Sequence, residues 1–158
     1  MSMKKLLVLP VLLIAKLAFA QTDDSIVKFV NPSTVSKPFG YSQAAVVDLG
    51  NSKMLIISGQ VALDVKGNLV GNGDIAKQTE QVFQNIKNIV ESAGGTMDNI
   101  VKLNYYTTDA SKIQALRATR DRFVNVKNPP ASTLMQVSKL FRPDILIEIE
   151  ATAIIPKK

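Results

Sequence analysis

Residues 129–138 read PPASTLMQVS and residues 147–151 read IEIEA, and the pattern of these two segments sets the architecture of the C-terminal part. Both alternate between two kinds of side chain, as strands do when one face is buried. In the last strand Ile147 and its i+2 neighbours share one face, whereas Glu148 and Glu150 share the other. The two prolines end any preceding helix. Two strands of one sheet are therefore predicted here.

The rest of the chain predicts two helices and several earlier strands. Apolar residues recur every three or four positions over residues 74–93, where Asp74 can cap the helix and Gly94 can end it. A second helix is predicted over residues 110–126. Its inward residues are Ile113, Leu116, Phe123 and Val124. Strands are predicted over residues 44–49, 53–58 and 100–107, and a short reversal over residues 60–65 and 69–70.

The resulting order, β, β, β, α, β, α, β, β, predicts an α+β domain in which one sheet carries both helices on one face. The other face is predicted to present Leu134 beside Gln136, and Leu146 beside Glu148. Such a mixed face favours burial against copies of the same chain, with polar side chains lining clefts between subunits. A half-solvated sheet face is the alternative.

The first 20 residues resemble a secretory signal peptide. Lys4 and Lys5 precede an apolar run that is too short to span a bilayer, and Ala18-Phe19-Ala20 forms an A-x-A cleavage site. An uncleaved amphipathic arm is the alternative. We therefore expect a leader over residues 1–20, one domain over residues 21–158, and a periplasmic or secreted protein with no membrane attachment after cleavage.

Composition excludes several kinds of chemistry. The chain contains no cysteine and no histidine, so a Cys nucleophile, a His base and a Cys/His zinc site are all impossible. The leader holds three of the 19 basic residues and none of the 13 acidic ones, which leaves a formal charge of +3 on the other 138 residues. This mild charge without a basic run gives no support for nucleic-acid binding.

Seven short segments carry a resemblance to a known family: Tyr41-Ser42-Gln43, Asp48-Leu49-Gly50-Asn51, Ser58-Gly59-Gln60, the helix over residues 78–94, Asp98-Asn99-Ile100-Val101-Lys102, Pro130-Ala131 and Ile147-Glu148-Ile149-Glu150-Ala151. With these segments and the order of its elements, the chain resembles the Rid family of reactive intermediate (enamine/imine) deaminases from about residue 31 to residue 154. The resemblance implies a chorismate-mutase-like fold and a homotrimer. Its sheets would form a central barrel, with three small-molecule pockets at the subunit interfaces.

The resemblance also implies an activity: the hydrolysis of 2-imino or 2-enamino acids to 2-oxo acids and ammonia without a cofactor or a metal. By position in the family pattern, Tyr41 would edge the pocket, Ser58 would line it, and Glu148 would orient or activate the attacking water. A glutamate between two isoleucines would have a raised pKa if buried, which suits a general acid or base. A salt-bridged or solvent-facing Glu148 is the alternative.

Three positions depart from the family pattern. Ser132 stands where an arginine grips the substrate carboxylate, and a hydroxyl cannot replace that bidentate contact. Leu134 stands where many members have a cysteine, and Arg117 where an asparagine is usual. Arg117 could supply the missing cation from the second helix, or it could lie on a solvated face beside Asp121.

Three functions follow as hypotheses. The first is an exported enzyme that hydrolyses an imine or enamine. The second is a non-catalytic trimer that binds a small ligand or a partner in the interfacial cleft. The third, RNA cleavage, is disfavoured by the leader, by the lack of histidine and by the lack of a basic stripe.

Overall fold

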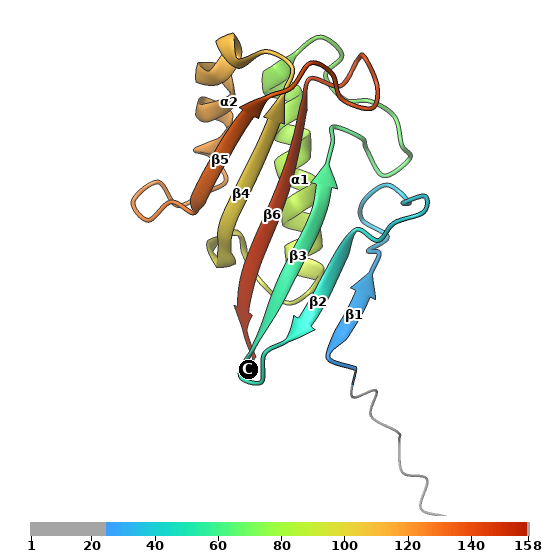
Figure 1. Cartoon of the computed structure of the whole chain (residues 1–158), viewed down its shortest axis with the longest axis vertical. Helices are drawn as coiled ribbons and strands as arrows, with labels where there is room; N and C mark the ends of the chain where they lie inside the picture. The colour runs from blue at the N-terminus through green and yellow to red at the C-terminus, as the bar shows by residue number, and fades with distance from the viewer. Residues whose placement is uncertain (1–24, 158) are drawn as a thin grey trace, which may run out of the picture.

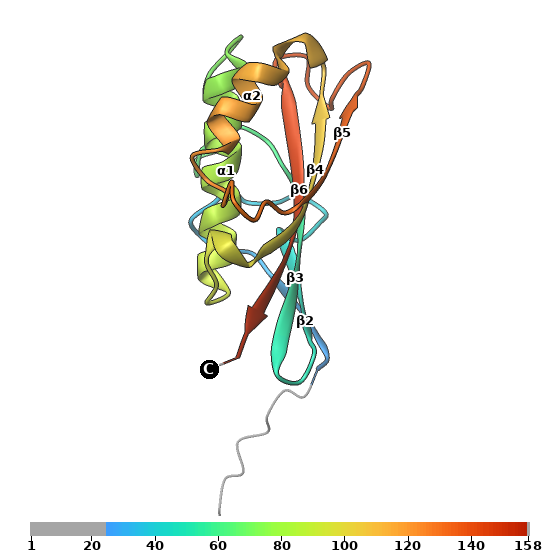
Figure 2. The same cartoon turned by 90° about the vertical axis from the view of Figure 1, so that its left-hand side faces the viewer.

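The computed structural model describes residues 25–157, in which one six-stranded mixed sheet carries two helices on one face (Figures 1 and 2). The predicted leader lies outside the described residues. The strands are β1 (Val27–Val30), β2 (Ala44–Asp48), β3 (Ser52–Gln60), β4 (Ile100–Thr107), β5 (Ala131–Gln136) and β6 (Ile147–Pro156), and their order in the sheet is β1-β2-β3-β6-β4-β5. The helices are α1 (Ile75–Ser92) and α2 (Ile113–Arg120), with short 3₁₀ turns at Met97–Asn99 and Ala110–Lys112. Among these six strands of the described residues, only β4 and β5 pair in parallel.

The core lies between the helices and the central strands. The apolar face of α1 includes Val82, Phe83 and Ile86, all fully buried, and it packs against β3 and β6. Every second residue of β6 from Ile147 to Ile155 is buried. The predicted alternation of this strand is therefore confirmed, and it sets which face of the sheet the helices cover. The other face is called the open face below.

The ends of α1 follow local sequence. Asp74 Oδ1 accepts hydrogen bonds from the backbone N–H groups of Ala76 (3.0 Å) and Lys77 (3.1 Å). After the helix, Gly94 adopts a φ of 84°, a conformation that side chains disfavour. Both predicted caps are confirmed.

Two predicted elements are wrong in extent. The second helix ends at Arg120 instead of residue 126, because the Phe123 N–H bonds the Arg120 carbonyl (2.8 Å) and tightens the chain into a turn. Phe123 still packs inward and stacks on Phe83, with ring centroids 5.2 Å apart. The reversal predicted over residues 60–70 forms a single bridge, Leu63 to Leu69, and adds no strand to the sheet.

One strand was not predicted, and one face was assigned wrongly. β1 is an edge strand with three exposed residues, so no burial pattern marks it in the sequence. In β5, Leu134 pairs with the buried Tyr105 and packs against the core. Leu134 thus lies on the helix side, while Glu148, which pairs with Tyr106, lies on the open face. The prediction that Leu134 and Glu148 share a face is wrong.

Candidate functional site

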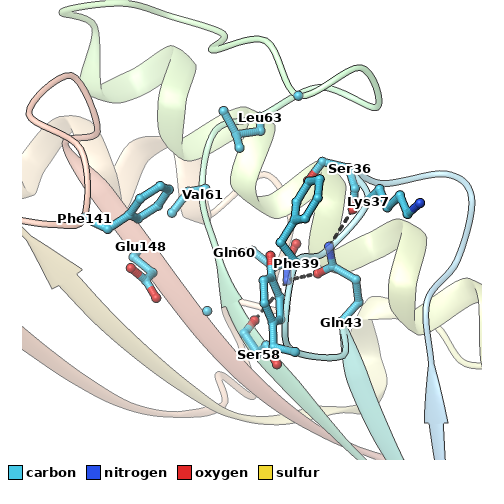
Figure 3. Close-up of a pocket in the computed structure, with 13 residues that line it drawn as sticks. Ser36, Lys37, Phe39, Gln43, Ser58, Gln60, Val61, Leu63, Phe141 and Glu148 are labelled. Atoms are coloured by element: carbon cyan, nitrogen blue, oxygen red, sulfur yellow. Dashed lines mark hydrogen bonds between the residues drawn. The ribbon is translucent and has the colours of Figure 1, made fainter.

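A cavity of about 640 Å³ lies where β3 and β6 meet the loops that precede β2 and β6 (Figure 3). Its lining includes two charged residues, Lys37 and Glu148, and three aromatic ones, Phe39, Tyr41 and Phe141. In Figure 3, Phe141 and Glu148 lie on one side of the cavity and Phe39 on the other. The amine end of Lys37 is directed away from Glu148. A mainly apolar cavity with a few polar groups is typical of a small-molecule site.

A β-bulge brings the β3 backbone close to Glu148. Ile57 pairs with Ala151 and Gln60 pairs with Ile149, so Ser58 and Gly59 together face one residue of β6. A Cβ at Gly59 would lie 2.7 Å from the Glu148 carboxyl carbon and 3.0 Å from its Cγ. The carboxyl group therefore occupies space that is free only because residue 59 is glycine.

Buried amides hold the floor of the cavity. Gln60 Nε2 donates to Gln43 Oε1 (2.7 Å) and to the Ser58 carbonyl (3.0 Å), and Gln43 Nε2 donates to the Ser36 carbonyl (2.7 Å). The Ser58 hydroxyl donates to the Ser42 carbonyl (2.7 Å). Because these donors are used within the protein, the floor is fixed in place before any ligand arrives.

Two side chains of α1 anchor the walls. Gln78, fully buried, donates to the Asp144 carbonyl (2.8 Å) and accepts from the Leu146 N–H (2.8 Å), which fixes the loop that carries Phe141. Asn85 Nδ2 donates to the carbonyls of Val61 (3.1 Å) and Leu63 (3.0 Å), at the end of β3. The helix thus positions both sides of the cavity.

Glu148 is half-buried and makes no hydrogen bond or ion pair with residues 25–157. Burial raises the pKa of Glu148 above its ordinary value of 4.5, and the negative charge of Glu150 adds to the rise. Glu150, in contrast, accepts hydrogen bonds from Tyr106 Oη (3.0 Å) and Asn104 Nδ2 (3.2 Å). Of these two carboxylates on the open face, Glu148 is the one available for proton transfer or for a ligand.

Comparison with known proteins identifies the family. The family model described as endoribonuclease L-PSP matches residues 34–155. A RutC family protein of Pyrococcus horikoshii is 38% identical over 118 residues, which cover 74% of this chain and 89% of the relative. The chain belongs to the Rid family. The 2-iminobutanoate/2-iminopropanoate deaminase of Salmonella typhimurium is 37% identical over 110 residues, or 68% of this chain and 83% of that protein.

Solved structures of the Rid family have the same chorismate-mutase-like fold. RidA from the Antarctic bacterium Psychrobacter aligns with a TM-score of 0.71 at 32% identity, covering 81% of this chain and 99% of that one. A Rid family protein from Yersinia pestis gives a TM-score of 0.72 at 31% identity, with coverages of 80% and 98%. The predicted family and fold are confirmed.

The structure of this Rid protein brings together three of the six predicted site residues. Tyr41, Ser58 and Glu148 line the cavity. Arg117 is exposed on α2, and Ser132 pairs with the buried Leu103 of β4, so both lie on the helix side of the sheet. Leu134 lies on that side as well. Within one chain, these three residues do not reach the cavity.

Arg117 also lacks the predicted partner. The Asp121 carboxylate pairs with its neighbour Arg120 (2.6 Å), whereas Arg117 makes no ion pair among the residues that the structure describes. Burial raises the pKa of Tyr105 to about 12, and the nearby side chains of Arg120 and Ser132 oppose this rise. The Tyr105 hydroxyl nevertheless makes no hydrogen bond of acceptable geometry within residues 25–157.

Sequence reasoning found Tyr41 but missed the other two aromatic residues and the glycine of the site. Phe39 and Phe141 belong to loops, where no periodicity marks a functional side chain. Gly59 was noted only as part of the Ser58-Gly59-Gln60 segment. A glycine inside an apolar strand is a signal for a bulge or a close approach, and that signal could have found it.

Proposed function

We propose that this Rid-family protein binds small molecules in the Glu148 cavity and hydrolyses reactive imine or enamine groups to oxo compounds and ammonia. The observation that carries the proposal is the half-buried Glu148 carboxylate, which has no partner within residues 25–157 and faces a cavity large enough for a ligand and water. The name of the Salmonella relative, 2-iminobutanoate/2-iminopropanoate deaminase, supports the same reaction class.

In the proposed reaction, Glu148 moves protons at both stages. Its carboxylate accepts a proton from water while the water oxygen bonds to the imine carbon. With a protonated imine, this addition leaves a neutral amino alcohol and a carboxylic acid. The carboxylic acid returns its proton to the nitrogen, and the C–N bond then breaks as the Glu148 carboxylate takes the hydroxyl proton and the carbonyl forms. The departing ammonia takes up that proton and leaves as ammonium. A carboxyl group whose pKa is raised above its ordinary value by burial and by the charge of Glu150 is a better base and can still return the proton.

The test is the rate of ammonia release from enzymatically generated 2-iminopropanoate, above the spontaneous rate. The protein is used from Gln21 onward. We expect catalysis that Glu148→Gln removes and that Glu150→Gln, two residues along the same strand face, retains. Catalysis that survives Glu148→Gln contradicts the assigned role.

A non-catalytic ligand-binding protein on the same scaffold is the second candidate, and Ser132 favours it. A serine hydroxyl cannot make the paired, charged contact of an arginine with a carboxylate. Loss of such a contact costs about 2–5 kcal/mol. No catalysis in the parent protein combined with a gain in Ser132→Arg supports this candidate. Catalysis that disappears in Arg117→Ala instead assigns the carboxylate contact to Arg117.

We also propose a homotrimer in which the open face is buried. Ile56 and Met135 lie on that face and are each 46% exposed in the single chain. Exposure of these apolar side chains to water is unfavourable, and contact with another subunit would bury them. In such an assembly a second subunit could bring β5, with Ser132 and Leu134, to the cavity. Light scattering after gel filtration should give three times the mass of one chain.

Export is a further proposal. Mass spectrometry of the protein recovered from a bacterial periplasm should show an N-terminus at Gln21. Recovery of chains that still begin at Met1 would contradict cleavage. Within residues 25–157, no helix combines the length and the apolar character needed to cross a membrane.

A further inference from the structure

We infer that the Glu148 cavity accepts an organic cation, a primary or quaternary ammonium group on a ligand without a carboxylate. The inference rests on the proposed function in one respect, since it places the ligand in the same cavity. The ligand inferred here differs in charge from the substrates of Rid deaminases, because those 2-imino acids carry a carboxylate.

The aromatic residues of the cavity provide the first reason. Phe39, Tyr41 and Phe141 are 87%, 52% and 68% exposed, although large aromatic side chains are normally covered. Aromatic faces are electron-rich, and they attract ammonium groups that come within about 6 Å of the ring centre. Aromatic walls beside a carboxylate are the usual surroundings of a bound organic cation.

The hydrogen-bonding groups provide the second reason. The side-chain donors of Gln43, Ser58 and Gln60 are directed at protein oxygens, as described above. The Glu148 carboxylate is an acceptor without a protein partner among the described residues. An ammonium group brings the donors that Glu148 lacks, whereas a carboxylate ligand would bring only further acceptors.

The distribution of charge provides the third reason. The other carboxylate on this face of β6, Glu150, accepts hydrogen bonds from Tyr106 and Asn104 and is not part of the cavity lining. Lys37 is the one cationic residue that the described part of the chain contributes to the lining, and its amine points away from Glu148 in Figure 3. A ligand cation beside Glu148 would therefore meet a net negative field in a partly desolvated cavity.

Three probes of nearly equal shape test the inference: benzylammonium, benzyl alcohol and benzoate. Their dissociation constants are measured by ligand-observed NMR at low salt and at a pH where Glu148 is ionised. We expect benzylammonium to bind about tenfold more tightly than benzyl alcohol, and benzoate to bind least. Benzoate binding as tightly as benzylammonium overturns the inference, and so does the absence of benzylammonium binding.

Variants assign the effect to named groups. Glu148→Gln should weaken benzylammonium about tenfold and leave benzyl alcohol unchanged, while the matched control Glu150→Gln should change either by less than about twofold. Phe141→Leu keeps an apolar side chain but removes the ring, so it should weaken benzylammonium about threefold. Equal losses of benzylammonium affinity in Glu148→Gln and Glu150→Gln would mean that the overall negative charge of this face attracts the cation. That result would overturn the assignment of the site to Glu148.

Failure of this inference and failure of the proposed function give different results. Ammonia release without benzylammonium binding removes the cation site and leaves the hydrolase. Benzylammonium binding that depends on Glu148, without ammonia release from 2-iminopropanoate, retains the cation site and removes the reaction on that substrate. Circular dichroism of each variant confirms that the fold is intact before either result is used.

Discussion

Gly59→Ala should uncouple the proposed activity of the Glu148 cavity from the stability of the fold. The added Cβ would lie 2.7 Å from the Glu148 carboxyl carbon, whereas non-bonded carbons prefer about 3.5–4.0 Å. The carboxyl group must therefore move by roughly 1 Å. A displacement of that size in a catalytic group can lower the rate by about 100-fold.

The same change should leave stability nearly unaltered. Gly59 is not among the glycines with positive φ, so alanine fits its backbone and stabilises the fold by about 0.4–1 kcal/mol through the unfolded chain. A Glu148 side chain forced off its rotamer costs about 0.5–1.5 kcal/mol. These two effects oppose each other, and we expect the free energy of unfolding to change by less than about 1 kcal/mol.

Ammonia release and benzylammonium binding measure the first effect, and urea unfolding measures the second. A double-mutant cycle tests whether Gly59→Ala acts through Glu148. If Gly59 only makes room for Glu148, the double variant should have the same ammonia release and benzylammonium affinity as Glu148→Gln alone. Full activity in Gly59→Ala would refute the reasoning. So would a loss of several kcal/mol in stability, because the bulge would then be structural.

Three other predictions concern the groups around the site. Gln78→Ala should lower the free energy of unfolding by about 2–4 kcal/mol, because the Asp144 carbonyl and the Leu146 N–H lose their partner. The control Gln84→Ala, at an exposed position of the same helix, should lower it by less than about 0.5 kcal/mol, with both values measured by urea unfolding. Because the pKa of Glu148 is raised, the folded protein holds the carboxyl proton of Glu148 more tightly than the unfolded chain does. The protonated Glu148 therefore contributes fully to stability below about pH 4.5, and this contribution is lost as pH rises through the higher pKa of the folded state. Glu148→Gln should therefore be at least as stable as the parent protein at pH 7, with the difference closing in acid; a parent protein that gains on the variant as pH rises would contradict this. Tyr105→Phe should leave thermal stability unchanged or raise it, since the buried hydroxyl has no partner in residues 25–157, whereas Tyr106→Phe loses a hydrogen bond and about 0.5–1.5 kcal/mol.

Local sequence was enough to predict the elements whose signals are local. The helix α1 has an apolar face at helical spacing, a capping aspartate and a terminal glycine, so its bounds were correct within about one residue. The alternation of β6 likewise identified its buried face. Resemblance to the Rid family then gave the overall fold and the three cavity residues Tyr41, Ser58 and Glu148.

Other features depend on contacts between segments that are distant in sequence. Alternation shows that Ser132 and Leu134 share a face, but only pairing with β4 decides that this is the helix side. Helical periodicity continues past Arg120, yet a turn places Phe123 on Phe83 without further helix. Edge strand β1 is recognised only by its pairing with β2.

The sequence by itself determined the secondary structure of the core and the exclusion of Cys and His chemistry, and its resemblance to the Rid family indicated Glu148, which lines the cavity. Only the tertiary structure decided what surrounds that residue. A bulge opposite β6 makes room for the carboxyl group, buried glutamines fix the floor, and two loops supply aromatic walls. The physical reason is that burial and the nearby charge of Glu150, which raise the pKa of Glu148, depend on side chains brought together by the fold.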